Sequence, residues 1–313
     1  MATIAFDLGG TKIKMGVVQS GKLLDWTSVK ADSEKGLVPK LPSLEEEMKA
    51  LLDKNHLILK DIEGVGIASP GLVNTDEMKV ISINEKYADI INFDLKKWAK
   101  DTWSAPLFLE NDARAALAGE WQSGAGKECD DIAGLTLGTG LGTSAVMQGK
   151  LVRGKHFQAG ILGGHFIVNV HGTPCNCGNI GCAEAEASTW NLKNLASKEP
   201  MWESSLLSKS DSIDYETVFN MADNGDKLSL KMRQHSLDIW ASTVINMIHA
   251  YDPEMVILNG GVMARSDVII PHIKQKVDNH AWLGWGKVKI VNAENLNTAA
   301  LLGVAYLATT FKK

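Results

Sequence analysis

The densest group of residues able to do chemistry is a set of cysteines in the middle of the chain. Cys175, Cys177 and Cys182 follow His165 in the pattern His-x9-Cys-x-Cys-x4-Cys. Three thiolates and one imidazole match the ligands of a closed tetrahedral zinc site, which holds a fold together and leaves no open position for catalysis. His171 is a second candidate for the imidazole ligand, but it lies only four residues before Cys175. We therefore expect a structural zinc ion bound by His165 and the three cysteines, with His171 on the surface.

A glycine turn near the N-terminus is a candidate phosphate site. It reads Asp-Leu-Gly-Gly-Thr-Lys and contributes Asp7, Gly9, Gly10, Thr11 and Lys12. Glycine lets backbone N–H groups approach phosphate oxygens without a Cβ in the way. A carboxylate such as that of Asp7 is the kind of ligand that Mg²⁺ takes. Taken alone, however, the motif is more typical of a tight turn that needs a positive φ.

A second glycine turn, Gly138-Thr139-Gly140, has the same surroundings as the first. In both copies a Leu-Gly pair lies 11 positions before a glutamine, and a Gly-Lys-Leu sequence follows that glutamine closely. Any two glycine hairpins share some features, so chance resemblance is one interpretation. We favour the other, an internal duplication in which two domains of one topology each present a glycine hairpin to a shared cleft.

Asn111 and Asp112 mark the junction between an apolar strand and an alanine-rich helix. Aspartate is a favoured helix N-cap, and a helix N-terminus tends to keep a carboxylate ionised. An ionised aspartate can also orient a hydroxyl and take its proton, as one does in phosphoryl transfer. The two interpretations of Asp112 are compatible, and Asn111 could hydrogen-bond a neighbouring hydroxyl of a polyol.

The elements that must position these residues follow from hydrophobic periodicity. Alternating apolar residues predict strand meanders over 2–26 and 131–155, each built around one glycine turn. Further strands are expected within 62–74, 105–111, 253–259 and 285–294, and helices within 35–60, 112–121, 190–250 and 297–311.

Length and composition restrict the classes of protein to consider. The chain has 313 residues, enough for two domains, with 45% apolar and 22% charged residues. A net charge of −5 argues against a general nucleic-acid binder, which usually needs a basic excess. No signal peptide, membrane-spanning run or secreted disulfide framework is evident, so we expect a cytoplasmic protein without membrane partners.

Taken together, the motifs resemble those of the ROK sugar kinases, a family that includes bacterial glucokinase, fructokinase and N-acetylhexosamine kinases. They occur in the order Asp-x-Gly-Gly-Thr, Pro-Gly, Asn-Asp, Gly-Thr-Gly-x-Gly, Gly-His, Cys-x-Cys-Gly-x2-Gly-Cys-x-Glu and Gly-Gly-Val. The resemblance implies an α/β fold of the two-domain actin/hexokinase-like (RNase H-like) class, with ATP and a sugar in a central cleft. We expect a smaller domain of residues 1–115 plus 300–313, and a larger domain of residues 116–299 that carries the zinc site.

The resemblance also implies roles for single residues. The phosphate hairpins would be Gly9-Gly10-Thr11 and Gly138-Thr139-Gly140, with Asp7 serving Mg²⁺ and both Gly260 and Gly261 near the adenosine. The sugar would contact Gly71 through its backbone, and the side chains of Asn111, Asp112, His165 and Glu184. Asp112 would take the proton from the attacking hydroxyl, usually the 6-hydroxyl, and His165 would bind both zinc and sugar.

One departure from the family pattern concerns the sugar. The family commonly has a sugar-binding glutamate three residues before the histidine, where this chain has Leu162. Glu186 is a possible substitute, although its spacing differs. We expect a glucokinase-like hexose kinase, with a fructose or N-acetylhexosamine kinase as an alternative. A non-catalytic sugar sensor or regulator is a further alternative, but residue 7 already begins the first hairpin and leaves no room for a DNA-binding domain before it. Family members are often homodimers or homotetramers, so self-association is expected.

Overall fold

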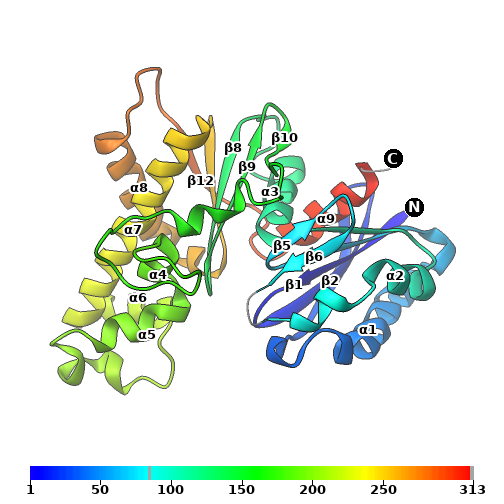
Figure 1. Ribbon diagram of the computed structural model, residues 1–313, viewed down its shortest axis with the longest axis horizontal. Coiled ribbons are helices and arrows are strands. Elements are labelled where there is room, and N and C mark those ends of the chain that lie inside the picture. The colour runs from blue at the N-terminus through cyan, green and yellow to red at the C-terminus, as the bar shows by residue number, and fades with distance from the viewer. Residues whose placement is uncertain (84–85, 311–313) are drawn as a thin grey trace. The chain divides into compact units, whose positions relative to one another are not determined.

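Contacts between residues divide the chain into two compact units, which are described separately. The computed structural model describes residues 1–83 and 86–310 (Figure 1). Unit 1 comprises Met1–Glu128, Leu151–Ala159 and Asn297–Lys313, and unit 2 comprises Cys129–Lys150 and Gly160–Leu296. The boundary expected between residues 115 and 116 falls inside the helix Asp112–Ser123. This whole helix belongs to unit 1 because it packs closely on the C-terminal helix.

Unit 1 is built on a five-stranded sheet with the order β3-β2-β1-β4-β7. β1 pairs antiparallel with β2 and parallel with β4, and β4 pairs parallel with β7. The first three strands are the predicted meander, and the parallel strands follow after helical crossovers. The strands are β1 Ala2–Leu8, β2 Lys12–Gln19, β3 Lys22–Lys30, β4 Ile62–Ser69 and β7 Leu107–Asn111, and a separate hairpin pairs β5 Leu72–Asn74 with β6 Lys79–Ser82.

Helices cover both faces of this sheet. Val65 and Ile67 of β4 belong to the apolar core that α1 and α2 complete, whereas Gly64 and Gly66 lie against α9. Since side chains alternate along a strand, these helices cover opposite faces. On the α9 side, α3 and α9 approach each other through small residues, which keeps α3 in unit 1. The helices are α1 Leu41–Lys54, α2 Leu95–Trp103, α3 Asp112–Ser123 and α9 Ala299–Thr310.

Unit 2 repeats the topology of unit 1. Its sheet has the order β10-β9-β8-β11-β12, with β8 antiparallel to β9 and parallel to β11, which is parallel to β12. When the strands of each five-stranded sheet are numbered in chain order, both sheets have the order 3-2-1-4-5. The two meanders therefore belong to sheets of the same topology, as the duplication predicts. The strands are β8 Ile132–Leu137, β9 Leu141–Met147, β10 Lys150–Leu151, β11 Met255–Asn259 and β12 Lys289–Asn292.

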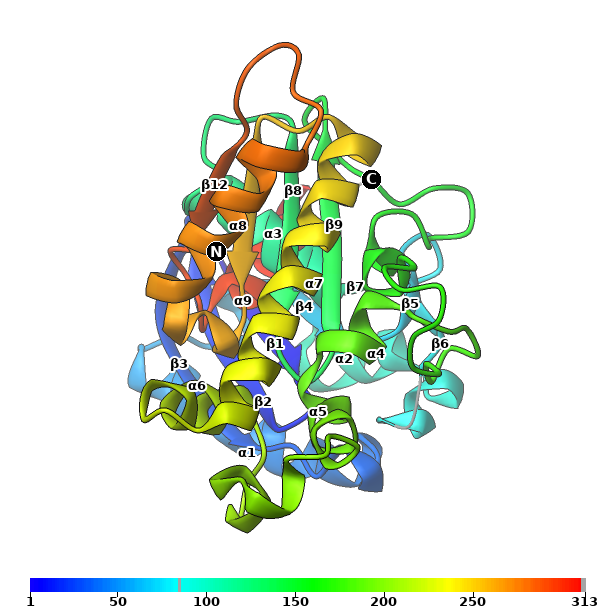
Figure 2. The ribbon, with the colours of Figure 1, turned by 90° about the vertical axis from the view of Figure 1, so that its left-hand side faces the viewer.

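The largest apolar core of unit 2 lies between its sheet and its helices. The longest helix, α7, runs past β8 and β9 (Figure 2) and buries Trp240, whose indole N–H donates to the Ala187 carbonyl. The helices are α4 Ala183–Ala187, α5 Thr189–Ser197, α6 Tyr215–Asp223, α7 Lys227–Tyr251 and α8 Ser266–His280.

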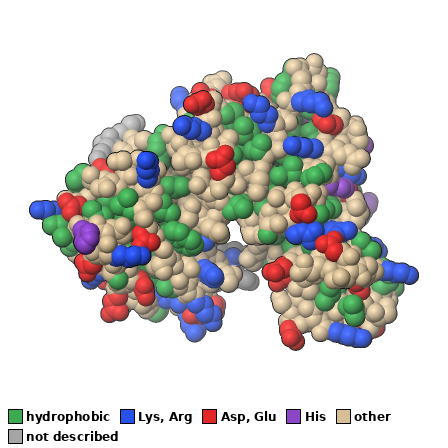
Figure 3. Space-filling view, turned by 180° about the vertical axis from the view of Figure 1, so that it is seen from behind, with side chains coloured by type: hydrophobic (Ala, Val, Ile, Leu, Met, Phe, Trp, Pro, Cys, Tyr) green, Lys and Arg blue, Asp and Glu red, His purple; other side chains and the backbone are tan. Residues whose placement is uncertain are grey.

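Within the described ranges, none of the helices combines the length and apolar character needed to cross a bilayer. On the face drawn in Figure 3, acidic and basic side chains are interspersed.

Candidate functional site

The predicted residues of unit 1 meet at one end of its sheet. The first glycine turn, residues 9–11, joins β1 to β2, Gly71 follows β4, and Asp112 follows β7. In the parallel register Ser69 lies opposite Asn111. The carboxyl ends of parallel strands are where open α/β sheets bind ligands, so the sequence-based grouping of these residues corresponds to one edge of one sheet.

Asn111, rather than Asp112, is the N-cap of α3. The Asn111 Oδ1 accepts hydrogen bonds from the N–H groups of Ala113 at 3.1 Å and Arg114 at 3.2 Å. Its Nδ2 donates to the Gly71 carbonyl and to Asp112 Oδ1, both at 3.0 Å. Asp112 is the first helical residue, and its Oδ1 also accepts the Ala113 N–H at 2.8 Å. The cap expected at Asp112 is thus supplied by Asn111. The Asn111 amide also links the Pro-Gly turn to the Asp112 carboxylate through its two hydrogen bonds.

Burial changes the acidity of Asp112. Loss of solvation and the nearby charge of Asp7 raise the pKa of Asp112 from 3.8 to about 6, against the lowering effect of the Ala113 N–H and Lys86. The helix N-terminus therefore does not keep this carboxylate at ordinary acidity, because desolvation of the charged form outweighs the favourable dipole. A pKa near 6 suits a general base that works close to neutral pH.

The first glycine turn is held from outside by residues that the sequence analysis did not identify. The Tyr87 hydroxyl donates to the Gly9 carbonyl at 2.7 Å, and the Ser33 hydroxyl donates to the Gly10 carbonyl at 3.1 Å. Lys86 also lies against Gly10. These residues come from stretches without a periodic pattern or a motif, so no sequence signal marked them.

Asp7 lies at the end of β1 beside this turn. Its carboxylate is 3.6 Å from the Lys14 ammonium, yet burial raises its pKa above the ordinary value despite that partner. Thr11 and Lys12 are exposed. A carboxylate oxygen is a ligand that a hard divalent cation accepts, so Asp7 fits a magnesium ligand. The positive charge of a magnesium ion would compensate the negative charge of the carboxylate, which burial disfavours.

A buried ionic cluster supports the strand end that carries Asn111. Glu110 and Arg114 are fully buried and lie 3.4 Å apart, and Arg153 reaches the other Glu110 oxygen at 2.7 Å. Glu110 also accepts the Asn111 N–H. Arg114 donates to the carbonyls of Val152, Phe157 and Ala159, and so fixes the returning segment 151–159 on unit 1.

In unit 2 the second glycine turn, residues 138–140, joins β8 to β9 at the matching place in the topology. Glu184 from α4 accepts the Leu141 N–H at 3.0 Å, and a Cβ on Gly140 would lie 2.6 Å from the same carboxylate. A side chain at residue 140 would therefore require the Glu184 carboxylate to move from its position at this turn. The N–H groups at the start of α5 donate to the carbonyls of Gly138 and Thr139, and Gly260, after β11, contacts the backbone of Leu137. Gly261, the next residue, opens a 3₁₀ turn.

The four predicted metal ligands form one cluster. His165, Cys175, Cys177 and Cys182 place their ligand atoms within 4.8 Å of one another. The Cys175 sulfur lies 3.7 Å from His165 Nδ1, and the sulfurs of Cys177 and Cys182 are 3.7 Å apart. With Zn–S bonds of ~2.3 Å, a tetrahedral site separates its sulfurs by about 3.8 Å, so the donor set and spacing fit zinc.

The rival histidine is outside the cluster. His171 is exposed, and its backbone N–H donates to the Asn169 side chain. Leu162, which stands where the family pattern has glutamate, is 44% exposed. Glu186 is buried, accepts the Thr173 N–H and lies 3.5 Å from His235. Glu186 therefore contacts the loop that carries the predicted metal ligands, through the Thr173 N–H.

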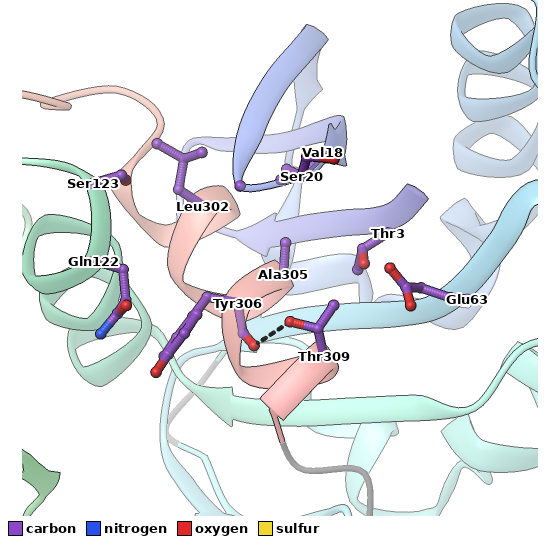
Figure 4. Close-up of a pocket in the computed structure, with 11 residues that line it drawn as sticks. Thr3, Val18, Ser20, Glu63, Gln122, Ser123, Leu302, Ala305, Tyr306 and Thr309 are labelled. Carbon is purple, nitrogen blue, oxygen red and sulfur yellow. Dashed lines mark hydrogen bonds between the residues drawn. The ribbon is translucent and has the colours of Figure 1, made fainter. Parts of the chain in front are cut away.

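A separate hollow of about 330 Å³ lies in unit 1, beside α9 (Figure 4). Thr3 and Glu63 line it from the starts of β1 and β4, and Tyr306 and Thr309 line it from α9. This is the opposite end of the strands from the glycine turn and Asp112. None of the predicted site residues contributes to the hollow.

Comparison with known proteins places these features in a family. The family model "ROK family" matches residues 3–311. A glucokinase of Thermotoga maritima is 31% identical over 309 residues, covering 96% of this chain and 95% of that protein. A β-glucoside kinase of Listeria monocytogenes is 29% identical over 98% of this chain and 97% of that protein. The xylose repressor of Bacillus subtilis is 28% identical over 70% of this chain, but only 53% of the repressor is matched.

Solved structures agree with the fold. The ROK hexokinase of Thermus thermophilus superposes with a TM-score of 0.79 at 25% identity, covering 99% of this chain and 98% of that one. A ROK family glucokinase of Streptomyces griseus, solved with glucose and AMPPNP, gives 0.77 at 28% identity and covers 99% of this chain and 100% of that one. The predicted α/β fold of the actin/hexokinase class is therefore confirmed, and the chain belongs to the ROK family.

Proposed function

We propose that the protein is an ATP-dependent sugar kinase that phosphorylates a hexose, at the 6-hydroxyl. The observation that carries the proposal is the placement of Asp112. Its carboxylate lies at the carboxyl end of the sheet beside the first glycine turn, is oriented by Asn111, and has a pKa of about 6. The glucokinase and hexokinase relatives support the substrate class.

In the proposed reaction, Asp112 accepts the proton of the sugar hydroxyl as that oxygen attacks the γ-phosphorus. The N–H groups of residues 9–11 and 138–140 would bind phosphate oxygens, since glycine turns expose them. Asp7 would hold the Mg²⁺ that accompanies ATP, which neutralises phosphate charge. Asn111 would bind a neighbouring sugar hydroxyl, and Gly71 would contact the sugar through its backbone.

In unit 2, a structural zinc ion bound by His165 and the three cysteines would fix the loop that precedes α4. His165 presents Nδ1 to the cysteine cluster, which leaves Nε2 for a sugar hydroxyl. Glu184 would bind sugar hydroxyls from the start of α4, while Gly260 and Gly261 would lie near the adenosine. The protein would act in the cytoplasm as a homodimer or homotetramer.

Leu162 bears on which sugar is used. A hydrogen bond to a charged group is worth ~1.5–3 kcal/mol, so a leucine in place of the family glutamate lowers affinity for a sugar that needs this acceptor. Fructose and N-acetylhexosamines are alternative substrates for the same machinery. The similarity to the xylose repressor favours a second candidate function, a sugar-responsive regulator without turnover.

A coupled assay of ADP release with Mg-ATP against glucose, mannose, fructose, N-acetylglucosamine, N-acetylmannosamine and a β-glucoside tests the proposal. We expect turnover with at least one of them, with NMR of the product locating the new phosphate on the 6-oxygen. Sugar binding detected by calorimetry, with no ADP formed from any sugar, would instead support the regulator.

A further inference from the structure

Lys86 lies over the first glycine turn. Its Nζ is 2.8 Å, and its Cε 3.0 Å, from the place that a Cβ on Gly10 would occupy. A side chain at residue 10 would require the end of the Lys86 side chain to shift. Glycine at this position therefore leaves room for the ammonium to approach the turn in the conformation observed.

The backbone beside Lys86 is held in an unusual conformation. Tyr87 is fully buried with a φ of 49°, in the left-handed region that a bulky residue adopts only at a cost of about 1–3 kcal/mol. The conformation is fixed by two hydrogen bonds, from the Tyr87 hydroxyl to the Gly9 carbonyl and from its N–H to the Ser33 carbonyl. Strained residues that the surrounding structure over-determines cluster at functional sites.

The charges around this turn are mainly negative. Asp7 and Asp112 lie close enough for the charge of Asp7 to raise the pKa of Asp112, and Lys86 is close enough to lower it. Lys14 is paired with Asp7. Among the described residues, Lys86 forms neither an ion pair within 4 Å nor a side-chain hydrogen bond, so its half-buried ammonium can bind an anion.

We propose that Lys86 is a catalytic residue whose ammonium contacts the γ-phosphoryl group as it is transferred. This inference rests on the proposed kinase function. The sugar oxygen forms a bond to the γ-phosphorus, the bond from that phosphorus to the β–γ bridging oxygen breaks, and Asp112 takes the hydroxyl proton. Lys86 stabilises charge on the γ-phosphoryl oxygens, in the way that a lysine does in other phosphoryl transfers.

The first test compares the steady-state kinetics of Lys86→Met, Lys86→Arg and a control, Lys97→Met. Lys97 is an exposed residue of α2 in the same unit and pairs with Asp101. We expect Lys86→Met to lower kcat by ~10²-fold, the typical effect of removing one oxyanion donor, with the sugar KM within about threefold of wild type. Lys86→Arg should recover part of the loss, and Lys97→Met should match wild type. A Lys86→Met kcat within threefold of wild type overturns the proposal.

A second test needs no sugar turnover and detects the γ-phosphate contact directly. Calorimetry measures Kd for Mg-ATP and Mg-ADP in wild type and in Lys86→Met, with circular dichroism to confirm that the variant is folded. We expect Mg-ATP affinity to fall about tenfold in the variant and Mg-ADP affinity to stay within twofold. Equal losses for both nucleotides, or no loss, overturn the assignment of Lys86. If wild type itself turns over no sugar, the kinase function fails, while the ATP-to-ADP comparison still decides whether Lys86 contacts the γ-phosphate.

Discussion

Replacing Asp112 with asparagine should abolish catalysis and stabilise the fold at the same time. Asparagine keeps an Oδ1 that can accept the Ala113 N–H and the Asn111 amide, so the local hydrogen bonds survive. It removes the charge that burial and Asp7 disfavour. The loss of the proton acceptor abolishes the reaction. The loss of the buried charge removes an unfavourable electrostatic energy from the folded state and so stabilises it.

The magnitude follows from the pKa. A folded-state value of about 6 against 3.8 in the unfolded chain corresponds to about 3 kcal/mol at most, at ~1.4 kcal/mol per pKa unit. Because the folded pKa is raised, the wild-type protein binds more protons folded than unfolded between these two values. The contribution of Asp112 to stability therefore falls as pH rises from 3.8 to 6, and that loss is nearly complete about one pH unit above 6. Asp112→Asn lacks this loss. Its free energy of unfolding should therefore exceed that of wild type by the full amount near pH 8 and by nothing below pH 4.

Urea unfolding at pH 4, 5, 6, 7 and 8 measures this advantage, with fluorescence as the probe. The same preparations give pH profiles of kcat/KM, where wild-type activity should decline below pH 6 and the variant should be inactive throughout. Glu63→Gln, at the other end of the sheet, is a matched carboxylate-to-amide control for the unfolding series. An Asp112→Asn protein that is less stable than wild type at pH 8, or near-native in activity, would refute the reasoning.

Three further outcomes are expected. Removing the metal with a chelator should raise the sugar KM before circular dichroism reports unfolding, because the Cys182 loop leads directly into the helix of Glu184; an unchanged KM after metal release, verified with a metal-sensitive dye, contradicts this. Gly140→Ala should raise the sugar KM several-fold more than Gly138→Ala, since a Cβ at 140 meets the Glu184 carboxylate at 2.6 Å and one at 138 meets no atom within 4 Å. Equal effects in steady-state kinetics would exclude displacement of Glu184. Arg114→Met should lower the free energy of unfolding by about 3 kcal/mol, because it removes one of the two guanidinium partners of the buried Glu110 and three hydrogen bonds to carbonyls of residues 151–159; hydrogen exchange should speed up in that segment, and a loss under 1 kcal/mol in urea would argue against Arg114 holding it.

Much of the site could be predicted from the sequence because its chemistry is carried by local motifs. The two glycines at a strand end lie next to each other in the chain, and the three cysteines lie within eight residues, so each motif is visible in the sequence. One histidine ten residues before the first cysteine completes the predicted zinc ligands. The similar order of the two meanders likewise indicated the shared strand order of both units, since strand pairing in a meander is itself local.

Other properties were decided only by the tertiary structure, because they depend on residues distant in sequence. The sequence indicated an ionised N-cap at Asp112, whereas packing made Asn111 the cap and raised the pKa of Asp112 through burial and Asp7. Lys86 and Tyr87 have no motif, and they reach the first glycine turn from 76 or more positions along the chain. The desolvation of Asp112 and the approach of Asp7 and Lys86 depend on how distant segments of the chain pack together. Residue spacing in the sequence therefore does not predict them.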